Sequence, residues 1–174
     1  LQLELFDQRE PRLHHLLAKH PQGSLELRLK LVHADFRFAA LLLQLTSLQP
    51  EVLDLLIAHP SASQVSYPLT GHPQLSQAQQ AQLHALKQRN FDLGLLQNPN
   101  LTLDLQRAYA QRQPDLRSVL ARNPGLALEL IAQLARDPET VVRLTVASRK
   151  RLPEDVQAHL ATDPKPAIRA ALMA

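Results

Sequence analysis

The chain has 174 residues and a formal net charge of +3, and 45% of its residues are apolar while only 3% are aromatic. It contains no cysteine, which excludes disulfides and thiolate metal sites. It also lacks the apolar run of about 18 residues that a membrane-spanning helix needs. The lack of cysteine is compatible with a reducing compartment, and a cytoplasmic location is our default expectation.

Near the N-terminus, leucines at helical spacing in residues 11–19 predict the opening helix of a first repeat. In residues 24–46, the run S-L-E-L-R-L-K-L alternates with a period of two, which formally indicates a strand. Leucine, glutamate, arginine and lysine favour helices, however, and none is β-branched, so we predict a helix. His20 and His59 are 39 residues apart. We therefore infer an extra half-repeat, inserted at 35–46.

The next segments alternate between regular and irregular sequence. Residues 48–59 predict a helix with Pro50 near its first turn. The following segment is expected to be irregular, because Pro68 interrupts it and Gly71 comes soon after. Residues 75–89 are rich in glutamine and predict a helix that is largely exposed to solvent.

Three of the eight histidines, His20, His59 and His72, each precede a proline, at places where Asn or Asp stands in other parts of the chain. We therefore predict that these histidines make hydrogen bonds at corners of the chain. The remaining histidines are scattered and lack the spacing of metal ligands, so no metal site is expected.

The C-terminal part of the chain contains one pattern twice. Residues 134–147 read L-A-R-D-P-E-T-V-V-R-L-T-V-A, and residues 160–172 read L-A-T-D-P-K-P-A-I-R-A-A-L, at an offset of 26 residues. A fixed period of this size is typical of a solenoid, in which each repeat buries its apolar face against its neighbours. A leucine opens each period, at Leu48, Leu75, Leu101, Leu126 and Leu152.

Each period is predicted to contain two short helices and two kinds of corner. Within a period, Asp137 can cap a new helix and Pro138 suits the first position of that helix. The second helix is predicted from 139 to about 148, because its apolar residues cover one broad arc. Between periods, Asn123 is followed by proline, a combination that favours a turn.

These two segments, together with N-P-G-L-A-L-E-L-I-A-Q and R-K-R-L-P-E-D-V-Q-A-H before them, resemble the leucine-rich repeat variant family. This family is a branch of the HEAT-like α-solenoids. The resemblance covers residues 98–174 and, more loosely, 48–97. It implies that one of the two helices in a repeat is often a 3-10 turn. Some members carry an iron–sulphur cluster in a cysteine-rich segment, and this feature does not carry over to a chain without cysteine.

The predicted fold is therefore all-α, a right-handed α-α superhelix of about six two-helix repeats of ~26 residues. We expect a single α-solenoid domain over residues 1–174. Within it, residues 1–47 would form irregular N-terminal repeats with the inserted helix, and residues 48–174 would form the regular repeats.

The most specific polar feature is an arginine that recurs with the period, at Arg117, Arg143 and Arg169. One interpretation is a cationic row that binds phosphates or an acidic partner. The other, which we favour, is a ladder in which each arginine bonds an Asp-Pro corner of its own or a neighbouring repeat, because periodic charges in a solenoid usually serve the period.

A second basic feature, Arg149-Lys150-Arg151, interrupts the pattern at a corner between two helices. It lies in residues 112–174, which contain ten Lys/Arg and seven Asp/Glu. This part of the chain therefore accounts for the whole net positive charge. The basic segment is either a binding site or a solvated turn.

No catalytic motif, phosphate-binding loop or cofactor signature is present, so we expect neither an enzyme nor a bound cofactor. The predicted function is a scaffold that binds another protein through the concave surface of the solenoid, with the six basic residues named above as contacts. The alternative is binding of a nucleic-acid duplex backbone by the basic C-terminal repeats. The chain ends in I-R-A-A-L-M-A without a polar capping repeat. We therefore expect either that the natural chain continues or that this end packs on a second copy.

Overall fold

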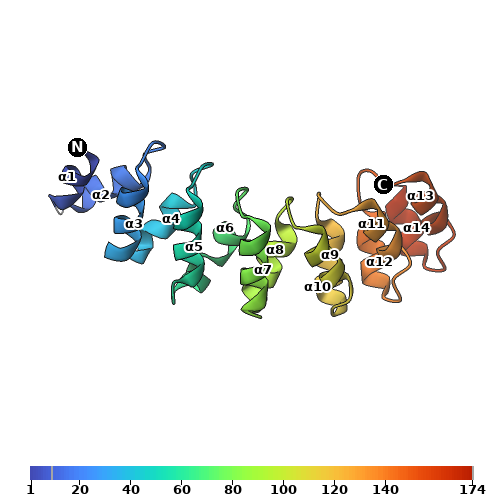
Figure 1. Cartoon of the computed structure of the whole chain (residues 1–174). Coiled ribbons are helices and arrows are strands. Elements are labelled where there is room, and N and C mark those ends of the chain that lie inside the picture. Colours follow the sequence, from blue (N-terminus) through green and yellow to red (C-terminus); the bar gives the residue numbers. More distant parts are fainter. Residues whose placement is uncertain (9, 174) are drawn as a thin grey trace. The chain divides into compact units, whose positions relative to one another are not determined.

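A computed structural model of the chain describes residues 1–8 and 10–173 (Figure 1). These residues form an all-α structure of 14 α-helices and two 3-10 helices, and none of the described residues lies in a strand. Every helix in this part of the chain is too short or too polar to cross a membrane. The chain divides into two compact units, Leu1–Leu95 and Leu96–Ala174. A single domain over residues 1–174 stays a prediction.

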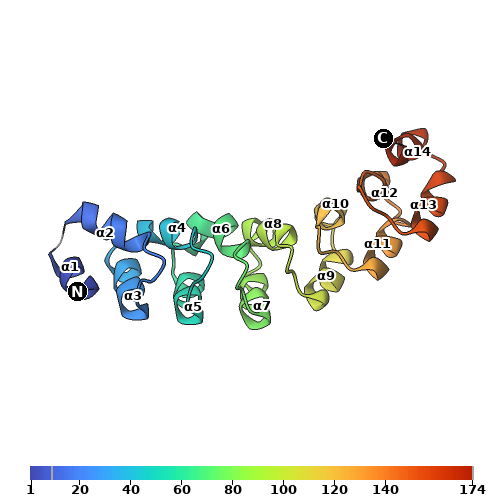
Figure 2. The same cartoon turned by 90° about the horizontal axis from the view of Figure 1, so that it is seen from above.

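In the first unit, helices of two kinds alternate along the chain (Figure 2). One row holds α1, α3, α5 and α7, with contacts from each helix to the next, and α2 contacts α4 in a second row. The elements are α1 (Gln2–Asp7), α2 (Pro11–Ala18), α3 (Leu25–Ala34), η1 (Phe36–Phe38), α4 (Ala39–Leu42), α5 (Pro50–Ala58), η2 (Ala62–Val65), α6 (Ser66–Thr70), α7 (Gln77–Ala85) and α8 (Arg89–Gln97), whose last residues belong to the second unit.

This alternation corrects the prediction for the N-terminal residues. The helix predicted at 11–19 is present as α2, but α1 precedes it, so it does not open the first helix pair. His20 follows α2 in the second row, whereas His59 follows α5 in the first row. Because the two histidines occupy different kinds of corner, one and a half periods separate them. No inserted element at 35–46 is needed to explain their spacing, and η1 and α4 form the ordinary second half of a pair.

Several predictions for residues 24–89 are confirmed and one is wrong. Residues 25–34 form a helix rather than a strand, begun by Ser24, whose hydroxyl accepts a hydrogen bond from Leu27 N–H at 3.3 Å. The helix with Pro50 at its start is α5. The helix α7, however, is not largely solvated, because Gln79 and Gln80 are buried. Gln79 reaches Asp54 at 2.7 Å and also completes a capping box with the serine that begins α7.

The second unit contains six helices in the same alternation (Figure 2). The helix α10 contacts α12, and α12 contacts α14, in one row, while α9 contacts α11 in the other. Each pair is also packed together, as α9 with α10, α11 with α12 and α13 with α14. The helices are α9 (Leu103–Ala110), α10 (Pro114–Arg122), α11 (Leu128–Leu134), α12 (Thr140–Ala147), α13 (Glu154–Ala161) and α14 (Pro166–Leu172).

Aliphatic side chains that recur with the period fill the space between the two rows. Leu120 on α10, Val146 on α12 and Leu160 on α13 are almost completely buried. Leu126 stands just before α11 and is also buried, as expected for an opening leucine that packs against the helix it precedes. Burial of apolar area stabilises the fold by about 25 cal/mol per Å², so these positions contribute to the driving force for folding.

Two glycines allow neighbouring segments to approach closely. A Cβ atom on Gly94 in α8 would lie 1.9 Å from Thr70 Oγ1 in α6. A Cβ atom on Gly125 would lie 2.0 Å from the carbonyl oxygen of Pro99, one period earlier. Gly125 therefore lets the backbone of one corner rest directly on the backbone of the preceding corner.

Candidate functional site

The candidate site is in the second unit. It includes two aspartates, each at the corner between the two helices of a pair. Asp137 Oδ1 accepts a hydrogen bond from Glu139 N–H at 2.8 Å, and Asp163 Oδ1 accepts one from Lys165 N–H at 2.8 Å. Glu139 and Lys165 are the N-cap residues of α12 and α14. The predicted role of Asp137 as the N-cap is therefore wrong. The aspartates instead close the turn that leads into the helix.

Each corner carboxylate is bound by an arginine from the preceding period. Arg117 donates to Asp137 from Nε at 2.7 Å and from Nη2 at 2.8 Å. Arg143 donates from Nε to Asp163 at 2.8 Å, with its Nη2 at 3.5 Å from the other oxygen. The aspartate side chains are at most 5% exposed and those of the arginines at most 14%. Such two-point contacts between charged groups are short and directional.

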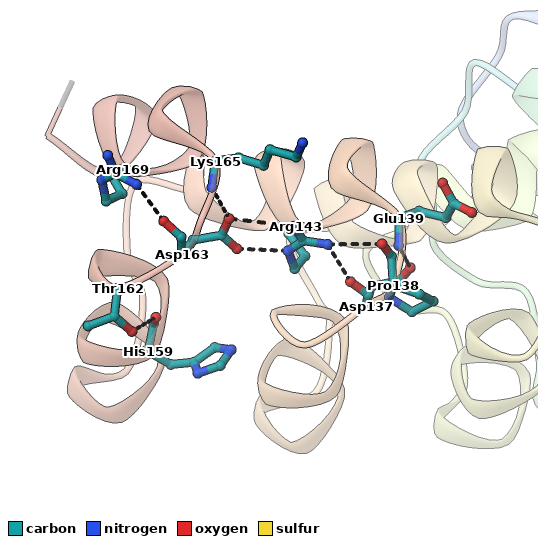
Figure 3. A network of polar contacts seen from close by, with 9 residues as sticks. All are labelled: Asp137, Pro138, Glu139, Arg143, His159, Thr162, Asp163, Lys165 and Arg169. Carbon is teal, nitrogen blue, oxygen red and sulfur yellow. Dashed lines mark hydrogen bonds and ion pairs between the residues drawn. The ribbon is translucent and has the colours of Figure 1, made fainter.

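Arg143 and Arg169 also bind backbone carbonyls of their own corner (Figure 3). Arg143 Nη1 donates to the carbonyls of Asp137 and Pro138, at 2.7 and 3.0 Å. Arg169 Nη1 donates to the carbonyl of Asp163 at 2.6 Å. Its side chain is exposed, and within residues 1–8 and 10–173 it has no carboxylate partner.

These contacts lower the pKa of both aspartates below its ordinary value. For Asp163, the hydrogen bond from Arg143 is the largest influence on the pKa. For Asp137, burial is the largest influence and raises the pKa, but hydrogen bonds from Arg117 and from Glu139 N–H, with the charges of Arg117 and Arg143, outweigh it. Both carboxylates therefore stay ionised and neutralise the arginines beside them.

The contacts of Arg117 and Arg143 with the corner aspartates thus agree with the ladder interpretation of the arginine row. Arg117 and Arg143 are engaged within the molecule, and only Arg169 presents a guanidinium to solvent. Binding of a partner by these three arginines stays a prediction.

A second ladder runs along the corners that separate the helix pairs. Asn123 Nδ2 donates to the carbonyls of Leu96 and Asn98, at 2.7 and 2.8 Å. Arg149 Nη1 donates to the carbonyls of Ala121 and Asn123, at 2.6 and 2.9 Å. The acceptors of Arg149 lie 25 residues after those of Asn123, so Arg149 takes the role that asparagine has one period earlier.

The basic segment therefore divides into two parts. Arg149 is half-buried and its guanidinium is directed at backbone carbonyls, and this burial lowers its pKa. Lys150 and Arg151 are exposed at the corner between α12 and α13. The interruption of the pattern at Arg149 thus has a structural explanation, which the recurring corner position could have indicated. The roles of Lys150 and Arg151 in binding stay predictions.

The histidine corners of the first unit are confirmed. In His20, His59 and His72, the ring Nδ1 accepts a hydrogen bond from the backbone N–H two residues later, at 3.2, 3.1 and 3.3 Å respectively. His72 Nε2 also lies 3.0 Å from the carbonyl oxygen of Leu45. This pair of contacts requires the neutral ring with its proton on Nε2. Burial lowers the pKa of His72 and favours the same state.

A feature that the sequence analysis missed lies on the exposed side of α10 and α12. Arg122, at the end of α10, borders two neighbouring hollows. One hollow is lined by Val141, Leu144, Thr145, Ser148, Arg149 and Arg122. The other is lined by Leu96, Gln97, Val119, Asn123, Pro124 and Arg122. Among the residues that the structure describes, Arg122 has no hydrogen-bond or ion-pair partner.

Apolar side chains on this side of the unit remain in contact with solvent. Val141 is 50% exposed, and Ala167 and Ala170, one period after Val141 and Leu144, are also exposed. Together with Arg122, these side chains can accommodate apolar groups next to one positive charge.

At the end of α14, Met173 is 85% exposed. Self-association through this end stays a prediction.

Within residues 1–8 and 10–173, no group of three or more His, Asp or Glu side chains is placed to hold a metal ion. Comparison with protein-family models, with curated proteins and with solved structures found no match to this chain.

Proposed function

We propose that this chain is a non-catalytic repeat scaffold that binds another protein through the side formed by α10, α12 and α14. The observation that carries the proposal is the exposure of Val141, Ala167 and Ala170 beside the hollow at Leu144. Apolar groups that stay in contact with water in a folded chain favour association with another apolar surface. We define the partner-facing side as Val141, Leu144, Ala167 and Ala170 together with Arg122.

The proposed architecture is an α-solenoid that resembles the leucine-rich repeat variant family, with a right-handed superhelix. Three features support it: the 26-residue period of the sequence, the alternating rows of helices, and the two hydrogen-bond ladders that recur with the period. In such an array each repeat contacts mainly its neighbours, and the concave side offers an extended binding surface. The partner-facing side would be part of that surface.

Protein binding is favoured over binding of a nucleic-acid duplex because much of the positive charge is already neutralised. Arg117 and Arg143 pair with aspartates, and Arg149 binds carbonyls. Counterion release from a duplex requires several cations that are free to contact phosphates. The low aromatic content also gives little surface on which single-stranded bases could stack.

A selection of random peptides displayed on phage against the immobilised protein tests the proposal. Peptides that bind the protein should lose binding to a Val141→Glu variant, because a charge would then lie in the middle of the partner-facing side. A matched control is Leu128→Glu, since Leu128 is 69% exposed on α11, in the other row of helices. Peptides that bind both variants equally would contradict the proposal. A labelled random duplex, measured by fluorescence anisotropy in low and moderate salt, tests the alternative.

A further inference from the structure

The two hollows described above meet at a single arginine of the partner-facing side. Arg122 borders both, with Val141 and Leu144 on one side and Val119 and Leu96 on the other. A binding segment that crosses this side must therefore pass the guanidinium of Arg122. The charge of Arg122 thus determines which side chains the segment can place there.

Arg122 has no compensating group in the described part of the chain, unlike several other arginines of the second unit. Arg117 and Arg143 pair with corner aspartates, Arg107 pairs with Glu129 at 2.8 Å, and Arg149 is directed at carbonyls. Arg122 is exposed and unpaired within the described part of the chain. An acidic group of a partner could approach it without first displacing an internal ion pair.

The surroundings of Arg122 strengthen an interaction with a carboxylate. Arginine offers several N–H donors in a plane that matches the two oxygens of a carboxylate. When a partner covers the apolar side chains nearby, water leaves the site and the effective dielectric constant falls, which makes the charged contact stronger. The half-buried guanidinium of Arg149 lines one of the same hollows and adds positive potential.

We infer that the partner-facing side binds a peptide segment in which an aspartate or glutamate contacts Arg122 while aliphatic residues next to it pack on Val141 and Leu144. This inference rests on the proposed function and specifies the chemistry of its partner. A phosphate group alone would use the charge but leave the exposed valine and the alanines of α14 uncovered. An acidic and aliphatic peptide uses both features.

The displayed-peptide selection tests this inference when it is followed by a counter-selection on an Arg122→Gln variant. Peptides retained by the wild-type protein but not by the variant should be enriched in Asp or Glu next to Leu, Ile or Val. Synthetic copies should bind the variant about tenfold more weakly or worse, as expected from the loss of a charge-assisted hydrogen bond. Arg112→Gln is the matched control, because Arg112 is exposed at the opposite end of α10.

The outcomes separate this inference from the proposed function. Peptides that depend on Val141 but show no acidic preference and bind Arg122→Gln normally would overturn the inference and leave the proposed function intact. If no selected peptide depends on Val141, both fail. Binding of the random duplex that is lost in Arg122→Gln, without any acidic peptide, would overturn the inference in favour of phosphate recognition. An Arg122→Glu variant that selects lysine-containing peptides instead would support it further.

Discussion

Replacement of Arg149 by alanine distinguishes a structural role for the basic corner from a role in binding. In the structure, Arg149 Nη1 donates hydrogen bonds of 2.6 and 2.9 Å to the carbonyls of Ala121 and Asn123. A hydrogen bond that involves a charged group contributes about 1.5–3 kcal/mol. Because Arg149 is half-buried, water can replace part of each bond. The low end of this range therefore applies to each of the two hydrogen bonds. We expect Arg149→Ala to lower the free energy of unfolding by about 2–3 kcal/mol.

Urea unfolding followed by far-UV circular dichroism measures this loss, since the chain has no tryptophan to report by fluorescence. For a slope of about 2 kcal/mol per M, the midpoint should fall by about 1 M or more. Lys150→Ala and Arg151→Ala are the controls, and as exposed substitutions they should stay within about 0.5 kcal/mol of the wild type. Arg149→Asn should recover part of the loss, because asparagine makes the equivalent contacts at Asn123.

An Arg149→Ala variant that unfolds at the wild-type urea concentration would refute this reasoning. The contacts with the two carbonyls would then contribute nothing measurable, and Arg149 would again be a candidate for binding. A loss equal in all three alanine variants would also contradict it, since it would point to the net charge of the corner rather than to hydrogen bonds.

Three other substitutions test separate features of the fold. Gly125→Ala should lower the free energy of unfolding by about 1–3 kcal/mol in urea titrations, because its Cβ would lie 2.0 Å from the backbone oxygen of Pro99. Lys87→Gly should raise the free energy of unfolding, measured by thermal denaturation, by about 0.5–1 kcal/mol. Lys87 has a φ angle of 53°, in the left-handed region that disfavours side chains. The free energy of unfolding should also fall in acid, because the pKa of Asp163 is lower in the folded chain than in the unfolded chain. The ionised Asp163 stabilises the fold at pH values above its unfolded pKa of about 4. This contribution is lost as the pH falls through the folded pKa. Asp163→Asn should flatten that part of a pH–stability curve measured by circular dichroism.

The period of the sequence was sufficient to predict the helical segments and the corners of the second unit. The spacing of Asp137 and Arg143 also indicated that arginines and corner aspartates belong together. It could not show which aspartate each arginine binds. The structure places the guanidinium of Arg143 on the carbonyls of its own corner and on the carboxylate of Asp163, twenty residues later. That choice depends on how far one helix pair lies from the next, which a single sequence does not specify.

Polar residues were the main source of error elsewhere. Gln79 and Gln80 were expected in solvent because glutamine is usually exposed, but hydrogen bonds to neighbouring segments compensate their burial. The sequence analysis expects Arg149 at the surface, as part of a binding site or of a solvated turn, whereas in the structure its guanidinium binds backbone carbonyls. Arg122 was missed because nothing in its local sequence distinguishes it from a solvated helix end. Its significance depends on the apolar side chains of α12, which only packing brings beside it.

The ladder of arginines and corner aspartates also restricts the symmetry of any assembly that uses the edge of a helix pair. The edge directed toward the C-terminus presents a guanidinium, as in Arg117, and the opposite edge presents a carboxylate, as in Asp137. Two copies of the same edge related by a two-fold axis would place arginine against arginine and leave both without an acceptor. Edges of this kind are complementary head to tail, so this ladder favours head-to-tail association over a two-fold contact through the same edge.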